Sequence, residues 1–239
     1  MDSQSTVYLI PSPLAQDTQH KAVPIYNQQV IASLKHFFAE NIRTARRFLS
    51  SLQLGIKIDT LNFYELNKNT TRAELKPVLR QLAQNNLSVG MISEAGSPCI
   101  ADPGNILVAL AHEIGLRVEP LVGASSILLA LIASGLNGQN FAFWGYLPIE
   151  EKSRVQKLQQ LEKLSLQYNQ AQIFMETPYR NEALLKSILQ HCHPETWLCI
   201  ATNITTIDEQ IRTQKIKDWK KQSLPDLDKK PTIFILQAN

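Results

Sequence analysis

Short apolar runs alternate with amphipathic segments in the first half of the chain. The apolar runs are too short for helices and are typical of buried strands, whereas the segments between them have the helical period. Thr71 and Glu74 are spaced as a capping box at the start of one such helix, and Gly115 ends another. Strands are expected at 6–11, 88–93 and 117–122, and helices at 71–84 and 103–115. This order predicts a parallel sheet.

The same kind of pattern starts again near residue 120. Strands are expected at 141–147, 171–176, 196–203 and 231–237, with helices at 152–168 and 181–192. The fold class is therefore α/β, with two α/β lobes that have mostly parallel central sheets. We expect an N-terminal lobe at residues 1–119 and a C-terminal lobe at residues 120–239. Such lobes usually bind a ligand in the cleft between them, at the carboxyl ends of the strands.

Composition and charge narrow the class of protein. The longest apolar run, residues 121–136, contains Gly and Ser and is shorter than the roughly 18 residues of a membrane span, so it predicts a buried helix. The first residues lack the basic flank and apolar core of a signal peptide. Three cysteines, an odd number, indicate reduced thiols, and we expect a cytoplasmic protein with no membrane partner. The formal charge of +3 is mildly basic, and the basic clusters at 43–47 and 215–221 are each typical of a solvated helix face.

Candidate chemistry lies in the loops that follow the predicted strands. These loops are rich in small and turn-forming residues, and Gly96 and Gly123 allow a ligand to approach the main chain closely. The loop at 123–126 also opens a helix, whose positive end suits a phosphate or a carboxylate. These features alone leave a nucleotide, a dinucleotide and S-adenosylmethionine open as the cofactor. The chain has no G-x-G-x-x-G after its first strand, no P-loop, no nucleophile elbow and no paired zinc-ligand motif, so we expect no metal.

Five segments, taken in order, resemble the motifs of one family. They read "AENIRTARRFL" (39–49), "SEAGSPCIADPG" (93–104), "VGASS" (122–126), "WGYLP" (144–148) and "ETPYR" (176–180). From about Val7 to Asn203 the chain resembles the tetrapyrrole methylase superfamily of S-adenosylmethionine-dependent methyltransferases, and within it the branch of ribosomal RNA small subunit methyltransferase I. The resemblance implies S-adenosylmethionine as cofactor, a homodimer, and 2′-O-methylation of a cytidine in the decoding region of 16S ribosomal RNA.

The resemblance also indicates site residues. Cofactor contacts are expected from Pro11, Ser93, Glu94, Ala95, Gly96, Ser97, Asp102, Gly123, Ala124, Ser125, Phe143, Tyr146, Met175 and Ala201. Asp102 is also expected to brace its loop by capping the helix that follows. The structural alternative for Phe143 and Tyr146 is that they belong to the hydrophobic core.

Methyl transfer to a ribose hydroxyl requires removal of the hydroxyl proton. Such a hydroxyl has a high pKa, so a base or a cation must assist its removal, and the candidates are Glu40, Arg43 and Glu176. Arg43 is also able to contact a phosphate. The structural alternatives are a surface ion pair between Glu40 and Arg43, three residues apart, and a helix N-cap region for Glu176.

Three segments depart from the family pattern, on the side that the resemblance assigns to the acceptor. The first loop, "IPSPLAQ" (10–16), has no glycine, and Asn41 and Ile42 replace an Asp–Thr pair. The segment "ATNITT" (201–206) lacks an Arg–Glu pair and a Lys. Two alternatives to an RNA methyltransferase therefore stay open. One is a methyltransferase on a tetrapyrrole-like small molecule, and the other is a cofactor-binding protein that has lost catalysis.

Overall fold

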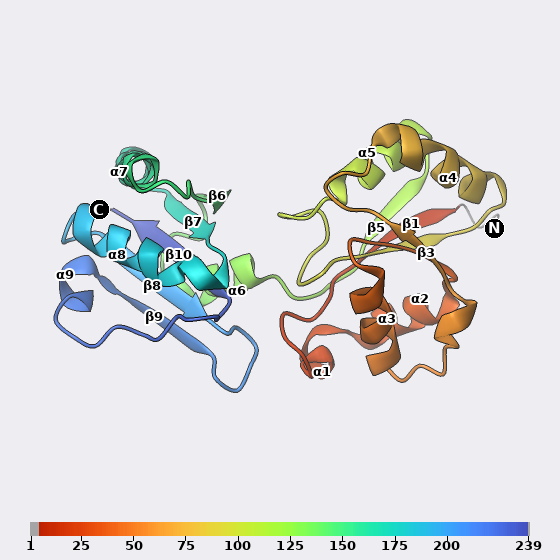
Figure 1. Ribbon diagram of the computed structural model, residues 1–239, viewed down its shortest axis with the longest axis horizontal. Helices are drawn as coiled ribbons and strands as arrows, with labels where there is room; N and C mark the ends of the chain where they lie inside the picture. The colour runs from red at the N-terminus through yellow and green to blue at the C-terminus, as the bar shows by residue number, and fades with distance from the viewer. Residues whose placement is uncertain (1–4, 239) are drawn as a thin grey trace. The chain divides into compact units, whose positions relative to one another are not determined.

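The computed structural model describes residues 5–238. The chain divides into two units, Met1–Ser125 and Ser126–Asn239, and each has its own sheet and helices (Figure 1). No helix within the described residues is both long enough and apolar enough to cross a membrane. The resemblance implies that residues 1–119 contain the acceptor side and part of the cofactor site and that residues 120–239 contain the rest of the cofactor site, and this division of roles stays a prediction.

Five parallel strands form the sheet of the first unit, in the order β3-β2-β4-β1-β5. A helix lies in each connection between them, as parallel strands require. The strands are β1 (Thr6–Ile10), β2 (His36–Ala39), β3 (Asn62–Glu65), β4 (Val89–Ile92) and β5 (Arg117–Pro120). The helices are α1 (Gln19–Ala22), α2 (Ile25–Ser33), α3 (Ile42–Ser51), η1 (Ile58–Thr60), α4 (Arg72–Gln84) and α5 (Asn105–Glu113). The expected parallel sheet is confirmed for this unit.

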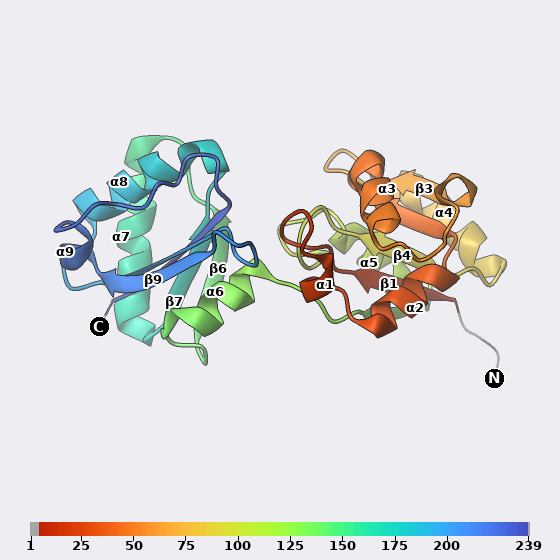
Figure 2. The ribbon, with the colours of Figure 1, turned by 90° about the horizontal axis from the view of Figure 1, so that it is seen from below.

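Helices cover both faces of this sheet, so its strands are apolar on both sides. Phe37 belongs to the core that α2 and α3 cover, whereas Phe38 belongs to the core under α4 and α5. Figure 1 shows α4 and α5 on one side of the strands, and Figure 2 views the unit from the α2–α3 side. The predicted capping box of Thr71 and Glu74 is present at the start of α4. Helix α5 begins at Asn105, later than the predicted residue 103.

The sheet of the second unit departs from the sequence-based expectation. Its order is β6-β7-β10-β8-β9, and only β6 and β7 are parallel. The short segment 203–209 joins β8 to β9 as a hairpin, which needs no helical crossover. The strands are β6 (Phe141–Tyr146), β7 (Ala171–Met175), β8 (Trp197–Thr202), β9 (Gln210–Lys215) and β10 (Thr232–Gln237). The prediction of mostly parallel sheets is therefore right for the first unit and wrong for the second.

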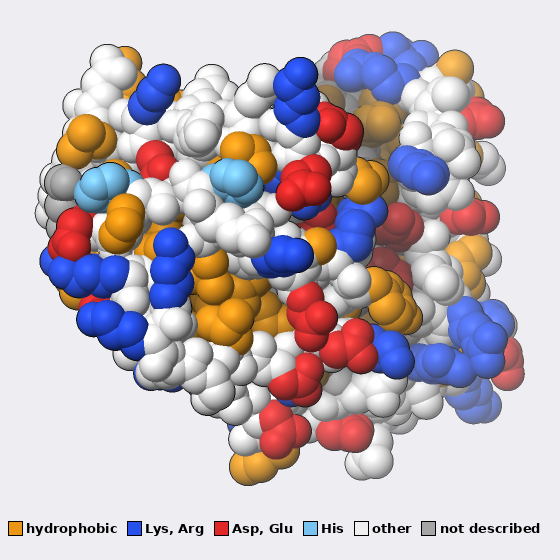
Figure 3. Space-filling model, turned by 60° about the vertical axis from the view of Figure 1, so that its left-hand side comes forward, with side chains coloured by type: hydrophobic (Ala, Val, Ile, Leu, Met, Phe, Trp, Pro, Cys, Tyr) orange, Lys and Arg blue, Asp and Glu red, His pale blue; other side chains and the backbone are white. Residues whose placement is uncertain are grey.

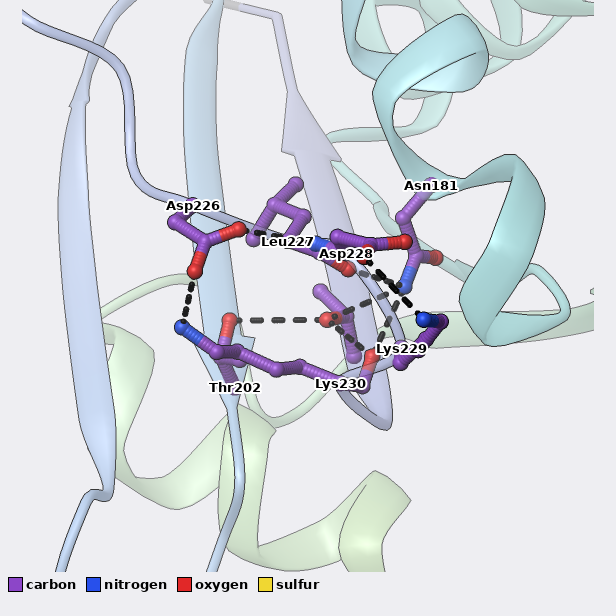
Figure 4. A network of polar contacts seen from close by, with 8 residues as sticks. Asn181, Thr202, Asp226, Leu227, Asp228, Lys229 and Lys230 are labelled. Carbon is purple, nitrogen blue, oxygen red and sulfur yellow. Dashed lines mark hydrogen bonds and ion pairs between the residues drawn. The ribbon is translucent and has the colours of Figure 1, made fainter.

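The helices of the second unit pack mainly against one core. They are α6 (Ser126–Ser134), α7 (Glu151–Tyr168), η2 (Pro178–Arg180), α8 (Asn181–His191) and α9 (Ile216–Trp219). The side chain of Asn181, fully buried at the start of α8, donates to the Lys230 carbonyl at 2.8 Å and to Thr232 Oγ1 at 3.4 Å (Figure 4). This amide ties α8 to the segment that leads into β10.

Helix α6 is less buried than the sequence predicts. Leu131 and Ala130 lie in the interior, but Leu128 is 48% exposed and Ile132, one turn later, is 79% exposed. The prediction of a buried helix at residues 121–136 is therefore only partly right. An apolar composition predicts burial of every side, whereas the sheet of this unit covers one side of the helix.

Candidate functional site

The loops singled out in the first half of the chain meet at one edge of the first sheet. Since its strands are parallel, their carboxyl ends share that edge, which is where open α/β sheets bind ligands. Ser12, just after β1, forms a two-way bridge with Gly96: each main-chain N–H donates to the other residue's carbonyl at 3.0 Å. The sheet order, with β4 beside β1, brings these two loops together.

Ser93 and Gly96 hold the β4 loop in shape. Ser93 Oγ donates to the Gly96 carbonyl, and the Ser12 hydroxyl donates to the Ser93 carbonyl at 2.6 Å. Gly96 has a φ of +71°, in the left-handed region that favours glycine. Both residues are buried, so their main-chain groups serve this packing. Their predicted contact with a cofactor stays a prediction.

Asp102 braces the remainder of the same loop. Its Oδ1 accepts from the Cys99 N–H at 3.3 Å and from the Gly104 N–H at 2.9 Å. The carboxylate therefore ties the turn together before α5 starts. Burial, with Asp102 nearby, raises the pKa of the Cys99 thiol to about 11, so Cys99 stays protonated near neutral pH. This agrees with a role for Cys99 as a small apolar filler.

The loop after β5 packs directly on the loop after β1. A Cβ added to Gly123 would lie 2.4 Å from Pro11 Cβ, so only glycine allows this approach. Ser97 Oγ donates to the Ala124 carbonyl at 3.2 Å, which joins the β4 and β5 loops. Pro11, Ser97, Gly123 and Ala124, all predicted cofactor residues, thus lie at one edge, where Ser125 ends the first unit.

Glu94 is the acidic side chain at the centre of this edge. The pKa of its carboxyl group is raised, first by partial desolvation and then by repulsion from Glu40 and, more weakly, from Asp102. Hydrogen bonds from Thr44 and from the Asn41 main chain act in the opposite direction. The residue as a whole is exposed, so the desolvation concerns the carboxyl group and not the whole side chain.

Glu40 and Arg43 flank the start of α3. Asn41 caps this helix, because its Oδ1 accepts from the main-chain N–H groups of Arg43 at 3.0 Å and Thr44 at 3.2 Å. Among the described residues, no ion pair joins Glu40 to Arg43, so the structural alternative raised for these two residues is absent. Their catalytic roles stay predictions.

Two pockets open beside Glu94. The α3 pocket, of about 610 Å³, is lined by residues 12–17 and 92–95, by Gln19, and by Thr44, Ala45, Arg47, Phe48 and Ser51 of α3. A smaller pocket of about 390 Å³ is lined by Glu40, Asn41, Asn67, Lys68, Asn69 and Glu94. Glu94 lines both pockets.

The α3 residues that line the larger pocket are not among the site residues predicted from the sequence. Thr44, Arg47, Phe48 and Ser51 are spaced i, i+3, i+4 and i+7, which places them on one side of a helix. That spacing is visible in "TARRFLSS" (44–51), but only the neighbouring loops reveal that this side faces a pocket.

In the second unit, Glu176 is buried and paired. Its Oε1 accepts from Arg180 Nη2 at 2.6 Å and from the Thr177 N–H at 2.6 Å, with 1% of the side chain exposed. These contacts make it a brace for the loop after β7. Of the predicted cofactor residues in this unit, Ala201 is buried, Phe143 and Met175 are half-buried and Tyr146 is 56% exposed. The alternative that Tyr146 is plain core is therefore wrong, and the cofactor role of all four stays a prediction.

The second unit also has a hollow that no predicted site residue lines. It measures about 640 Å³ and lies between α8 and the segment after α9, with Leu185, Leu189, Leu224 and Lys220 in its lining. Figure 3 shows hydrophobic side chains gathered in a hollow where this unit comes forward, with charged side chains around them.

Comparison with solved structures defines the fold. The methyltransferase CobJ superposes with a TM-score of 0.62 at 15% identity, over 98% of this chain and 93% of that one. Uroporphyrin-III C-methyltransferase from Thermus thermophilus, in complex with S-adenosyl homocysteine, gives a TM-score of 0.56 at 15% identity, over 98% and 97% of the two chains. The protein therefore has the tetrapyrrole methylase fold. No family model matches the chain.

Curated relatives define the family. The chain is 30% identical over 208 residues to ribosomal RNA small subunit methyltransferase I of Vibrio cholerae, which covers 86% of this chain and 67% of the relative. It is 31% identical over 218 residues to the protein of the same name from Streptococcus pyogenes, covering 90% and 70%. The chain belongs to the ribosomal RNA small subunit methyltransferase I family. The prediction of a methyltransferase that depends on S-adenosylmethionine is thereby confirmed.

Proposed function

We propose that this protein transfers the methyl group of S-adenosylmethionine to a ribose hydroxyl of 16S ribosomal RNA. The observation that carries the proposal is the identity of about 30% with ribosomal RNA methyltransferases over most of the chain. The likeness to tetrapyrrole methylases, at 15% identity, supports the fold and not a tetrapyrrole acceptor. A ribosomal substrate also favours the predicted cytoplasmic location.

The residues around Glu94 fit this cofactor. When bound, S-adenosylmethionine supplies an electrophilic methyl group on a positively charged sulfur, and it also carries an ammonium group. Partial desolvation, with repulsion from Glu40 and Asp102, raises the pKa of Glu94, so a cation placed beside it stabilises the charged carboxylate.

The carboxylates at the carboxyl edge of the first sheet are the groups that can remove the proton of the ribose hydroxyl. We infer that Glu40 and Glu94, which line a common pocket, accept the hydroxyl proton, while Arg43 contacts a phosphate. S-adenosylmethionine bound beside Glu94 would supply the methyl group and leave as S-adenosylhomocysteine, while the carboxylate that holds the hydroxyl proton would pass it to water. Glu176, held by Arg180, positions the loop that directly follows Met175.

Calorimetric titration with S-adenosylmethionine tests the cofactor and Glu94 together. Because a bound cation lowers the raised pKa of Glu94, binding releases a proton at pH values between the bound-state and free-state pKa. Affinity therefore rises with pH across that window, and the heat depends on the ionisation enthalpy of the buffer. Glu94→Gln should bind more weakly and lose the buffer dependence.

Transfer of radioactive methyl to 30S subunits that lack this modification tests the acceptor. We expect label in 16S ribosomal RNA, at a position that resists alkaline cleavage because the 2′ oxygen is blocked. Tight cofactor binding without labelling of any RNA would instead favour a protein that has lost catalysis. Absence of cofactor binding would overturn the proposed function altogether.

A further inference from the structure

We propose that the α3 pocket receives the acceptor nucleotide of the RNA, with Arg47 at its rim holding a phosphate. This inference rests on the proposed function, because it names where the substrate of that reaction binds. The pocket volume of about 610 Å³ lies within the roughly 300–1,000 Å³ of small-molecule sites. Enzymes that modify a nucleotide commonly take it out of the stack and into such a pocket.

The lining suits a nucleotide. Leu14 is half-buried and supplies apolar surface for the flat face of a base, while Phe48 and Ile92, 8% and 2% exposed, line the pocket as part of the buried core. Gln16, Gln19 and Thr44 supply amide and hydroxyl groups for its polar edge. An apolar floor with a few polar groups is the usual composition of a specific small-molecule site.

The positive charge of Arg47 at the rim of the α3 pocket favours binding of RNA there over binding of the cationic cofactor. Arg47 is exposed, and among the described residues no carboxylate pairs with its guanidinium group. A guanidinium group attracts a phosphate and repels a sulfonium ion, so this end of the pocket suits the RNA backbone. Glu94, which lines the pocket from the β4 loop, suits the cationic cofactor and the hydroxyl that reacts with it.

The other basic cluster of the chain, at residues 215–221, differs from Arg47 because several of its lysines pair with carboxylates. Lys215 and Lys217 both pair with Glu195, at 2.9 Å and 2.6 Å, and they lower the pKa of that carboxyl to about 2. Lys221 pairs with Asp218 at 3.2 Å. Much of the positive charge at 215–221 is therefore neutralised within the protein, which favours α3 as the surface that meets phosphate.

Arg47→Ala tests the inference, with Arg80→Ala as a control that removes the same charge from an exposed position on α4. Binding is measured with a labelled single-stranded RNA that has the sequence of the 16S decoding region, over a range of salt concentrations. We expect Arg47→Ala to weaken binding about tenfold and to reduce the salt slope by about 1. Arg80→Ala should match the native protein, and both variants should bind S-adenosylmethionine normally.

Ser51→Trp provides a second test, because it places a bulky side chain on the exposed α3 face that lines the pocket. We expect loss of methyl transfer to 30S subunits with unchanged cofactor affinity and an unchanged circular dichroism spectrum. Equal RNA affinities of Arg47→Ala and Arg80→Ala would overturn the assignment. So would a loss of cofactor affinity in either α3 variant, because the α3 side of the pocket would then contact the cofactor and not the RNA. A native protein that binds neither cofactor nor RNA would overturn the proposed function as well.

Discussion

Single residues decide how the loops at the carboxyl edge fit together. The first loop lacks the glycine of the family pattern, yet the close approach of main chains is kept. Pro11 packs on Gly123, and Ser12 pairs with Gly96, so the glycines of the β4 and β5 loops provide the space. The segment "IPSPLAQ" therefore keeps close contacts with the loops after β4 and β5 without a glycine of its own.

Gly123→Ala is expected to destabilise the protein by about 1–3 kcal/mol, because the new methyl group would overlap the rigid ring of Pro11. Gly138→Ala is the matched control, since a Cβ at Gly138 meets no atom within 4 Å and its φ is not in the left-handed region. Urea unfolding of the two variants measures the difference. Equal midpoints for both variants would show that the loops move apart at little cost.

At the scale of elements, the start of α3 links fold and site. Asn41 stands where the family has Asp, and its side chain caps the helix that presents Thr44, Arg47 and Phe48 to the pocket. The Asn41 main chain also hydrogen-bonds to Glu94. Asn41 therefore keeps the capping role open to the Asp of the family pattern, because Asn and Asp are about equally good caps.

Asn41→Ala should lower the free energy of unfolding by about 1 kcal/mol, through loss of two hydrogen bonds to the helix N-terminus. Asn41→Asp, which restores the family residue, should keep the native stability. Thermal unfolding followed by circular dichroism compares the three proteins. An alanine variant as stable as the native protein would mean that water replaces the cap.

Strand β9 of the second unit is an element that hydrophobic periodicity did not predict. Residues 210–215 form the edge strand β9, whereas its last residue, Lys215, was grouped with a basic helix face. The strand is mostly polar, and Lys215 and Lys217 pair with Glu195 near the neighbouring strand β8. An edge strand needs one apolar face at most, so its sequence resembles a loop.

At the scale of the whole molecule, the predicted homodimer needs an apolar surface. We propose that α6 provides it, because Leu128 and Ile132 lie one turn apart and are exposed on the same side of the helix. Isolated exposed apolar residues are common. Here, however, the sequence predicts a buried helix, and the two large side chains that it exposes favour an interface with a second copy of the chain.

Ile132→Lys is expected to convert a dimer into monomers without loss of fold, since 79% of this side chain is exposed. Ile207→Lys is the control, at a position that is 96% exposed in the loop between β8 and β9. Sedimentation velocity measures the mass of each variant. A dimeric Ile132→Lys protein would exclude α6 as the interface, and a monomeric native protein would exclude the homodimer itself.

The parallel first sheet, the capping of α4 and the order of the family motifs follow from the sequence, and the cofactor class follows from the resemblance that those motifs establish. These features depend on local spacing: two-residue or 3.6-residue periods, caps three residues apart, and loops directly after strands. Only the tertiary structure decided that Ser12 meets Gly96, that Arg47 and Glu94 line one pocket, and that the second sheet is mostly antiparallel. The physical reason is that a hydrophobic pattern records how far each position is buried. It does not record which segment, distant in the chain, provides the burial.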